Sequence, residues 1–159
     1  MNDIEERLLT QIAGLAPTLV APTFQTLSAM RELDAAMLAH PQAEISIDHL
    51  IHGGMYARTA HVPADTLVSG VVMARATVLV LQGDVTVFTG AESVRLTGFN
   101  VLPGSAGRKQ LFRTHSDVHM TMLLPSNAQS VFEAEHDFTD EPELLMWTPG
   151  HVTITGEKA

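Results

Sequence analysis

TLVSGVVMARATVLVLQGDVTVFT, which spans residues 66–89, is the stretch of sequence that decides the fold class. Valine, threonine and leucine dominate two runs within it, as is typical of β-strands. Between these runs lies Gln82-Gly83-Asp84, whose glycine and aspartate are typical of a turn. The stretch therefore predicts a β-hairpin, with strands over residues 77–81 and 85–89.

Short β-rich runs continue on both sides of this stretch from residue 44 onward. They recur roughly every 8–12 residues with Gly, Pro, Asn or Asp between them, as is typical of an antiparallel sandwich or barrel. The acidic stretch 133–143 is predicted to be turn-rich surface, and 144–147 to be a last strand or a short helix. The runs predicted as strands are 45–48, 55–58, 66–72, 77–81, 85–89, 93–96, 99–102, 110–114 and 118–124.

The first forty residues carry a helical pattern instead. Apolar residues at helical spacing predict one helix near the start and a second over about 23–39, which Pro41 ends. We therefore divide the chain into a helical arm, 1–42, and a β-barrel domain, 43–159. Two interpretations of the arm stay open: it covers its own domain, or it docks on a neighbouring subunit. The apolar positions of the first helix are Ile4, Leu8, Leu9, Ile12 and Leu15.

Composition excludes several classes of function. The 159 residues, 45% hydrophobic and 17% charged, fit one globular domain. A net charge of -9 opposes a phosphate backbone, so we expect no direct nucleic-acid binding. The basic cluster Arg108, Lys109 and Arg113 is predicted to be ordinary surface. Without cysteine there are no disulfides or thiolates, and without a long apolar run or a signal sequence we expect a soluble protein with no membrane partner.

Four segments follow one another in an order that resembles a known family. They are AAMLAHPQAEISIDHLIHGGMYAR (35–58), HVPADTLVSG (61–70), LQGDVTVF (81–88) and LPGSAGRKQLFRTHSDV (102–118). Together they resemble the cupins, which are double-stranded β-helix barrels, and in particular small cupin-like proteins encoded by phages and prophages. The resemblance covers residues 35–124. It implies a mainly β, jelly-roll-like cupin barrel, here preceded by two N-terminal helices, and a homodimer or larger homo-oligomer, because cupin barrels commonly pair through their sheets.

The resemblance also implies that the metal ligands of the family are missing. Metal-binding cupins carry two histidines, a following Glu and a further histidine, which converge in the barrel mouth. Counted back from Gly83, the second histidine position falls at Val72 and the carboxylate position at Ala76, while the further histidine position falls near Gln110. The nearby charge, Arg75, repels a cation. We therefore expect neither a metal nor another cofactor.

Other histidines offer an alternative ligand set. His115, Asp117 and His119 alternate along a predicted strand, so all three point to the same face. Two imidazoles and a carboxylate can bind zinc or iron. The opposing interpretation, which we favour, is that they are surface or barrel-wall residues.

Two hypotheses of function follow. The first, which we favour, is a non-catalytic structural or interaction protein, such as a phage virion or assembly component. It would act as a homo-oligomer, with other phage structural proteins as partners, in the bacterial cytoplasm or the virion. The second is a small-molecule site in the concave barrel mouth, or a metal-dependent enzyme built on His115, Asp117 and His119. The candidate lining residues of that mouth are Tyr56, Arg58, Met73, Arg75, Gln110, Phe112 and His119.

Overall fold

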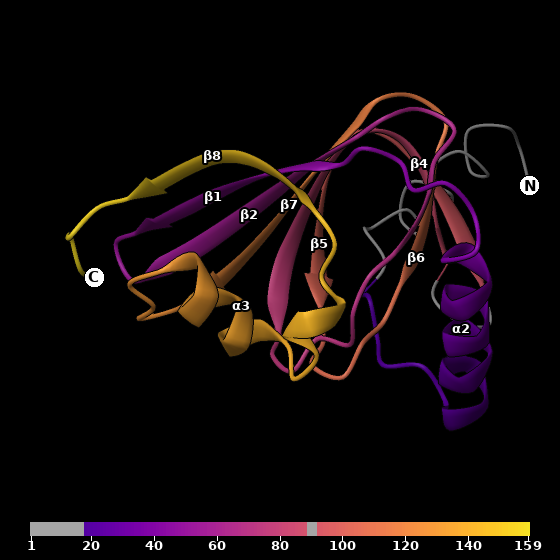
Figure 1. Cartoon of the computed structure of the whole chain (residues 1–159), viewed down its shortest axis with the longest axis horizontal. Helices are drawn as coiled ribbons and strands as arrows, with labels where there is room; N and C mark the ends of the chain where they lie inside the picture. Colours follow the sequence, from indigo (N-terminus) through magenta and orange to yellow (C-terminus); the bar gives the residue numbers. More distant parts are fainter. Residues whose placement is uncertain (1–17, 89–91) are drawn as a thin grey trace, which may run out of the picture.

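A computed structural model describes residues 18–88 and 92–159, and these residues form a mainly β structure (Figure 1). The helices are α2 (Phe24–Met37), α3 (Val131–Phe138) and a short 3-10 helix, η1 (Pro142–Leu144). None of the helices in this part of the chain is long and apolar enough to cross a membrane. The strands are β1 (Ser46–His52), β2 (Met55–Val62), β3 (Leu67–Ser69), β4 (Thr77–Phe88), β5 (Ser93–Gly104), β6 (Leu111–Thr114), β7 (Val118–Pro125) and β8 (Thr148–Ile154).

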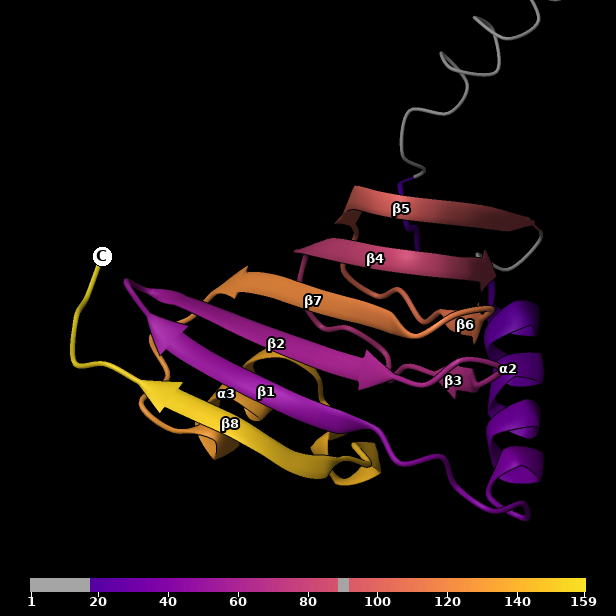
Figure 2. The same ribbon diagram turned by 90° about the horizontal axis from the view of Figure 1, so that it is seen from above.

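The eight strands form one curled sheet, in which seven follow the order β3-β6-β4-β7-β2-β1-β8 and β5 pairs with β4 beside this path (Figure 2). Strand β4 lies at its centre: β5 pairs with it along its whole length, while β7 and β6 pair with successive parts of it. All pairs are antiparallel except β1 with β8. The mainly β prediction is confirmed. The barrel, however, is a half-barrel, because β8 extends the sheet beside β1 instead of closing it.

The core lies on the concave side of this sheet. Helix α3 and the segment that follows it lie across the open side of the sheet (Figure 1). Leu19 adds to the core from the N-terminal side, where its backbone bridges to the end of β5 through hydrogen bonds with Pro103 and Ser105. The largest core side chains with no more than 1% exposure are Leu19, Tyr56, Leu81, Leu102, Leu124 and Phe138.

The predicted turn at Gln82-Gly83-Asp84 is wrong, because β4 runs through it without interruption. Strand β5 is likewise continuous where two short strands were expected. Gly83 serves a close approach instead: a Cβ atom there would lie 2.8 Å from the carbonyl oxygen of Asp117. The link between β6 and β7 runs beside β4 at this point, because β6 and β7 pair with successive parts of the same edge of β4, and the backbone N–H of His115 donates to the Asp84 carbonyl oxygen (2.8 Å).

The second predicted helix is confirmed as α2, which begins after Thr23, whose hydroxyl oxygen accepts a hydrogen bond from the N–H of Thr26 (3.2 Å). The first predicted helix lies outside the described residues, and the division of the chain at residue 42 stays a prediction. Helix α2 lies at the end of the sheet that carries β6 (Figure 1), and Figure 2 shows it beside β3 and β6.

Two ion pairs hold α2 against the β-domain. Lys109 Nζ lies 2.8 Å from Asp34 Oδ2, and Arg31 pairs with Glu141. Arg108 and Lys109 are only 3% and 4% exposed, so the prediction of ordinary surface is wrong for both. Arg108 bonds to Thr77, and Lys109 pairs with Asp34 of α2, so both side chains join separate segments of the chain. These partners are distant in sequence, so the basic cluster alone could not indicate them.

Two further segments differ from expectation. The acidic stretch contains α3, which Ser130 caps by accepting a hydrogen bond from the N–H of Glu133 (3.1 Å). Strand β8 was missed because Pro149 and Gly150 interrupt its pattern. At Gly150 the strand bulges tightly around the Asp48 side chain, where a Cβ atom would not fit.

Candidate functional site

The structure places the predicted pocket residues in different environments. Tyr56, Met73 and Phe112 are buried in the core cluster. Gln110 is also buried, with no hydrogen-bond partner for its Nε2 atom among the described residues. Arg75 is exposed in the loop before β4. Arg58 is hydrogen-bonded to Tyr56, whereas His119 lies on the opposite face of the sheet.

On the concave side of the sheet, between the sheet and α3, lies a compact polar cluster formed by His49, Tyr56, Arg58 and Glu135. His49 Nδ1 lies 2.7 Å from the Tyr56 hydroxyl, and Arg58 donates to Glu135 Oε1 at 2.8 Å. Aromatic rings enclose the cluster: Phe138 stacks on Tyr56 and lies 5.7 Å from the Arg58 guanidinium. The cluster joins β1 and β2 to α3, so its bonds stabilise the cover of the half-barrel.

Burial keeps the His49–Tyr56 pair neutral. Removal from water, helped by the nearby Arg58 charge, lowers the pKa of His49 to about 4. Burial also raises the pKa of Tyr56 to about 12, although Arg58 acts in the opposite direction. At neutral pH neither group carries a charge. The cluster is therefore suited to holding elements together rather than to proton transfer.

The neutral state of His49 makes folding sensitive to acid. Because its pKa is lower in the folded chain than in the unfolded chain, the unfolded state binds more protons between about pH 6.5 and pH 4. We expect His49 to contribute stability that is fully present above this range and is lost as the pH falls through it, by about 1.4 kcal/mol per pH unit. When the free energy of unfolding is measured with urea at several pH values, it should fall less with decreasing pH for His49→Gln than for the wild type. An equal dependence on pH in the two proteins would contradict this assignment.

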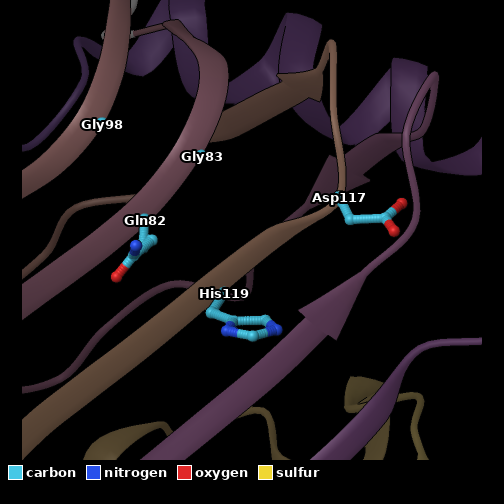
Figure 3. A pocket seen from close by; sticks show the side chains of 5 residues that line it. All are labelled: Gln82, Gly83, Gly98, Asp117 and His119. Carbon is cyan, nitrogen blue, oxygen red and sulfur yellow. The ribbon is translucent and has the colours of Figure 1, made fainter.

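A second feature is a hollow on the outer face of the sheet (Figure 3). It has a volume of about 460 Å³ and is lined by Gln82, Gly83, Gly98, Asp117 and His119. Gly83 of β4 and Gly98 of β5 are register partners, and both contribute to its lining. Gln82 and His119 face each other across β4 and β7 and form one wall.

The alternative ligand set does not come together. His115 Nε2 lies 2.8 Å from the Thr86 hydroxyl, and Asp117 Oδ1 accepts a hydrogen bond from the N–H of Ala64. His115 and Asp117 belong to the irregular link between β6 and β7, where strand alternation does not hold. Asp117 lines the hollow together with His119, whereas His115 bonds to Thr86 instead. Within residues 18–88 and 92–159, no three His, Asp or Glu side chains are gathered as a metal site.

The positions where the cupin ligands were expected lie in two adjoining loops. The backbone N–H of Gly70 donates to the Gln110 carbonyl oxygen at 3.0 Å, and that of Met73 to the Arg108 carbonyl oxygen at 2.9 Å. Val72 belongs to this loop, where its carbonyl oxygen accepts a hydrogen bond from the Thr139 hydroxyl. Ala76 is exposed.

Comparison with known proteins gives likenesses of fold only. No protein-family model matches the sequence, and no curated protein matches it. Among solved structures, the chain is similar to a cupin-2 domain protein of Shewanella frigidimarina (10% identity, TM-score 0.43, 58% of this chain and 91% of that one). It is also similar to a cupin domain of Schizosaccharomyces pombe (14% identity, TM-score 0.44, 64% and 77%). A third is salicylate 1,2-dioxygenase of Pseudaminobacter salicylatoxidans (14% identity, TM-score 0.46, 80% and 41%). Because identities and scores are low, what those proteins do is not carried over to this chain.

Proposed function

We propose that this chain is a non-catalytic interaction protein that associates with further copies of itself through the outer face of its sheet. A phage virion or assembly component, in the virion or the bacterial cytoplasm, is the class of protein that the sequence resemblance suggests. Support comes first from the concave side, where Tyr56, Met73 and Phe112 pack into the core instead of lining an open mouth. Arg58 is occupied by Glu135, so it is not available to a ligand carboxylate.

The observation that carries the proposal is an apolar patch on the outer face of β4 and β5. Val78, Phe99 and Val101 are 42%, 66% and 48% exposed. Strand β5 is also an edge strand over most of its length. Exposed apolar side chains that gather on neighbouring strands mark interaction surfaces more often than scattered ones do.

A second copy of the chain is the occupant that fits this patch. The patch carries no charge although the chain has a net charge of -9, so two copies that meet here place no like charges of the patch opposite one another. The one carboxylate of β4, Asp84, is paired with Arg95 at 2.7–2.8 Å. Two identical sheets can stack face to face around a twofold axis, and a stable pair would bury on the order of 800 Å² on each copy.

Light scattering coupled to gel filtration tests this proposal. At micromolar concentration we expect the wild type to show a multiple of the chain mass of 17.2 kDa. The double variant Phe99→Ser/Val101→Ser should elute as a monomer with unchanged circular dichroism. The matched control is Val152→Ser/Ile154→Ser, which changes apolar side chains of similar exposure on β8 and should keep the wild-type mass. A monomeric wild type would contradict the proposal.

A further inference from the structure

Two histidines face each other on the outer side of the sheet, outside every site described above except the rim of the hollow. His61 of β2 and His119 of β7 are register partners. Their ring centres lie 4.7 Å apart, with the rings nearly perpendicular at 77°. Both side chains reach solvent, and His119 also lines the hollow beside Gln82. Two imidazoles at this separation can share one small ion.

A carboxylate fixes the orientation of one of these rings. Asp48 Oδ2 lies 2.7 Å from His61 Nε2, and its other oxygen accepts a hydrogen bond from the backbone N–H of His151 (2.8 Å). An imidazole nitrogen that donates to a carboxylate carries the proton, so Nδ1 of His61 keeps its lone pair. This carboxylate–histidine pair is the arrangement that supports metal-bound histidines in proteins.

The two histidines keep ring nitrogens that are available to a ligand. In the sheet, β2 lies between β1, which carries Asp48, and β7, which carries His119. Among the described residues, no hydrogen bond uses Nδ1 of His61 or either ring nitrogen of His119. The chain's net charge of -9 also favours a cation at its surface.

From this juxtaposition we infer that His61 and His119 chelate a divalent transition metal such as zinc on the outer face of the sheet, with Asp48 as the residue that positions His61. Imidazole nitrogens prefer zinc, copper and nickel over magnesium or calcium. Two protein ligands leave the remaining coordination positions to water, and the hollow beside His119 gives room for it. Any further ligand at this ion would enter through the same hollow, where Gln82 can contact it.

Isothermal titration of the untagged full chain with zinc chloride tests this inference. We expect one zinc per chain, with magnesium chloride giving no heat of binding. His61→Gln and His119→Gln should each weaken zinc binding by at least about tenfold, and Asp48→Asn by about 10- to 100-fold. The matched control, His115→Gln, removes a nearby outer histidine that bonds to Thr86 and should bind zinc as the wild type does.

A second measurement does not depend on how the variants fold. In wild-type protein with labelled histidine, nitrogen resonances of the His61 and His119 rings should shift on zinc addition, while those of buried His49 should not. The inference is overturned if zinc does not bind, if it binds without shifting these two rings, or if the His61→Gln and His119→Gln variants retain wild-type affinity.

Discussion

Replacing Glu135 with alanine is expected to lower the free energy of unfolding by about 3–5 kcal/mol, because it leaves the Arg58 charge buried without a partner. The two side chains are only 12% and 14% exposed, and their Nη1 and Oε1 atoms lie 2.8 Å apart. The ion pair also joins β2 to α3, which covers the core. Urea unfolding followed by the fluorescence of Trp147, the single tryptophan, measures the loss, since Trp147 lies against His49 in the same region.

The double variant Arg58→Met/Glu135→Leu separates the charge from the packing. Because both partners are then apolar and of similar size, we expect it to recover most of the stability lost in Glu135→Ala. Methionine can keep the contact that the Arg58 side chain makes with Phe138. A loss below about 1 kcal/mol in Glu135→Ala would instead show that water solvates Arg58 as it does a surface ion pair.

Local sequence pattern was enough to predict most strands but not their continuity. The alternation that predicts strands at 55–58 and 118–124 depends only on which residues face the core, and β2 and β7 contain these runs. The turn prediction at Gly83 is wrong because a glycine between two β-runs has the same pattern whether it forms a turn or lies where another segment packs too closely for a side chain. The residue that packs there, Asp117, is far away in sequence. Helix α3 did leave a local sign, a Ser130-x-x-Glu133 pattern at its start.

The candidate sites depended on sheet register, which no local pattern contains. Tyr56 and Arg58 are two residues apart on β2, so strand alternation alone predicts that they share a face. Their partners could not be named: Glu135 is 77 residues from Arg58 in sequence. His119 was assigned to the barrel mouth, yet it lies on the outer face beside His61. A shift of one residue in the strand alternation moves a side chain from one face of the sheet to the other, so the face of His119 depends on the exact register.

Replacing Gly83 with alanine is expected to cost about 4 kcal/mol of folding free energy, from backbone strain and steric overlap together. The φ angle of Gly83 is 132°, where L-residues are rarely found, and the new Cβ atom would lie 2.8 Å from both the Asp117 carbonyl oxygen and Val118 Cγ2. The backbone oxygen cannot rotate away, because Asp117 belongs to the link that the Asp84 backbone binds through Ser116 (3.0 Å).

Gly98 is the matched control, since it faces Gly83 across β4 and β5 and also has a positive φ of 72°. No atom lies within 4 Å of a Cβ added there, so Gly98→Ala should cost only the backbone term of about 1–2 kcal/mol. The difference between the two variants in the free energy of unfolding, measured with urea, therefore reports how closely the β6–β7 link packs against β4 at Gly83. Equal losses would mean that Gly83 is needed only for its backbone φ angle and that the β6–β7 link does not pack closely against it.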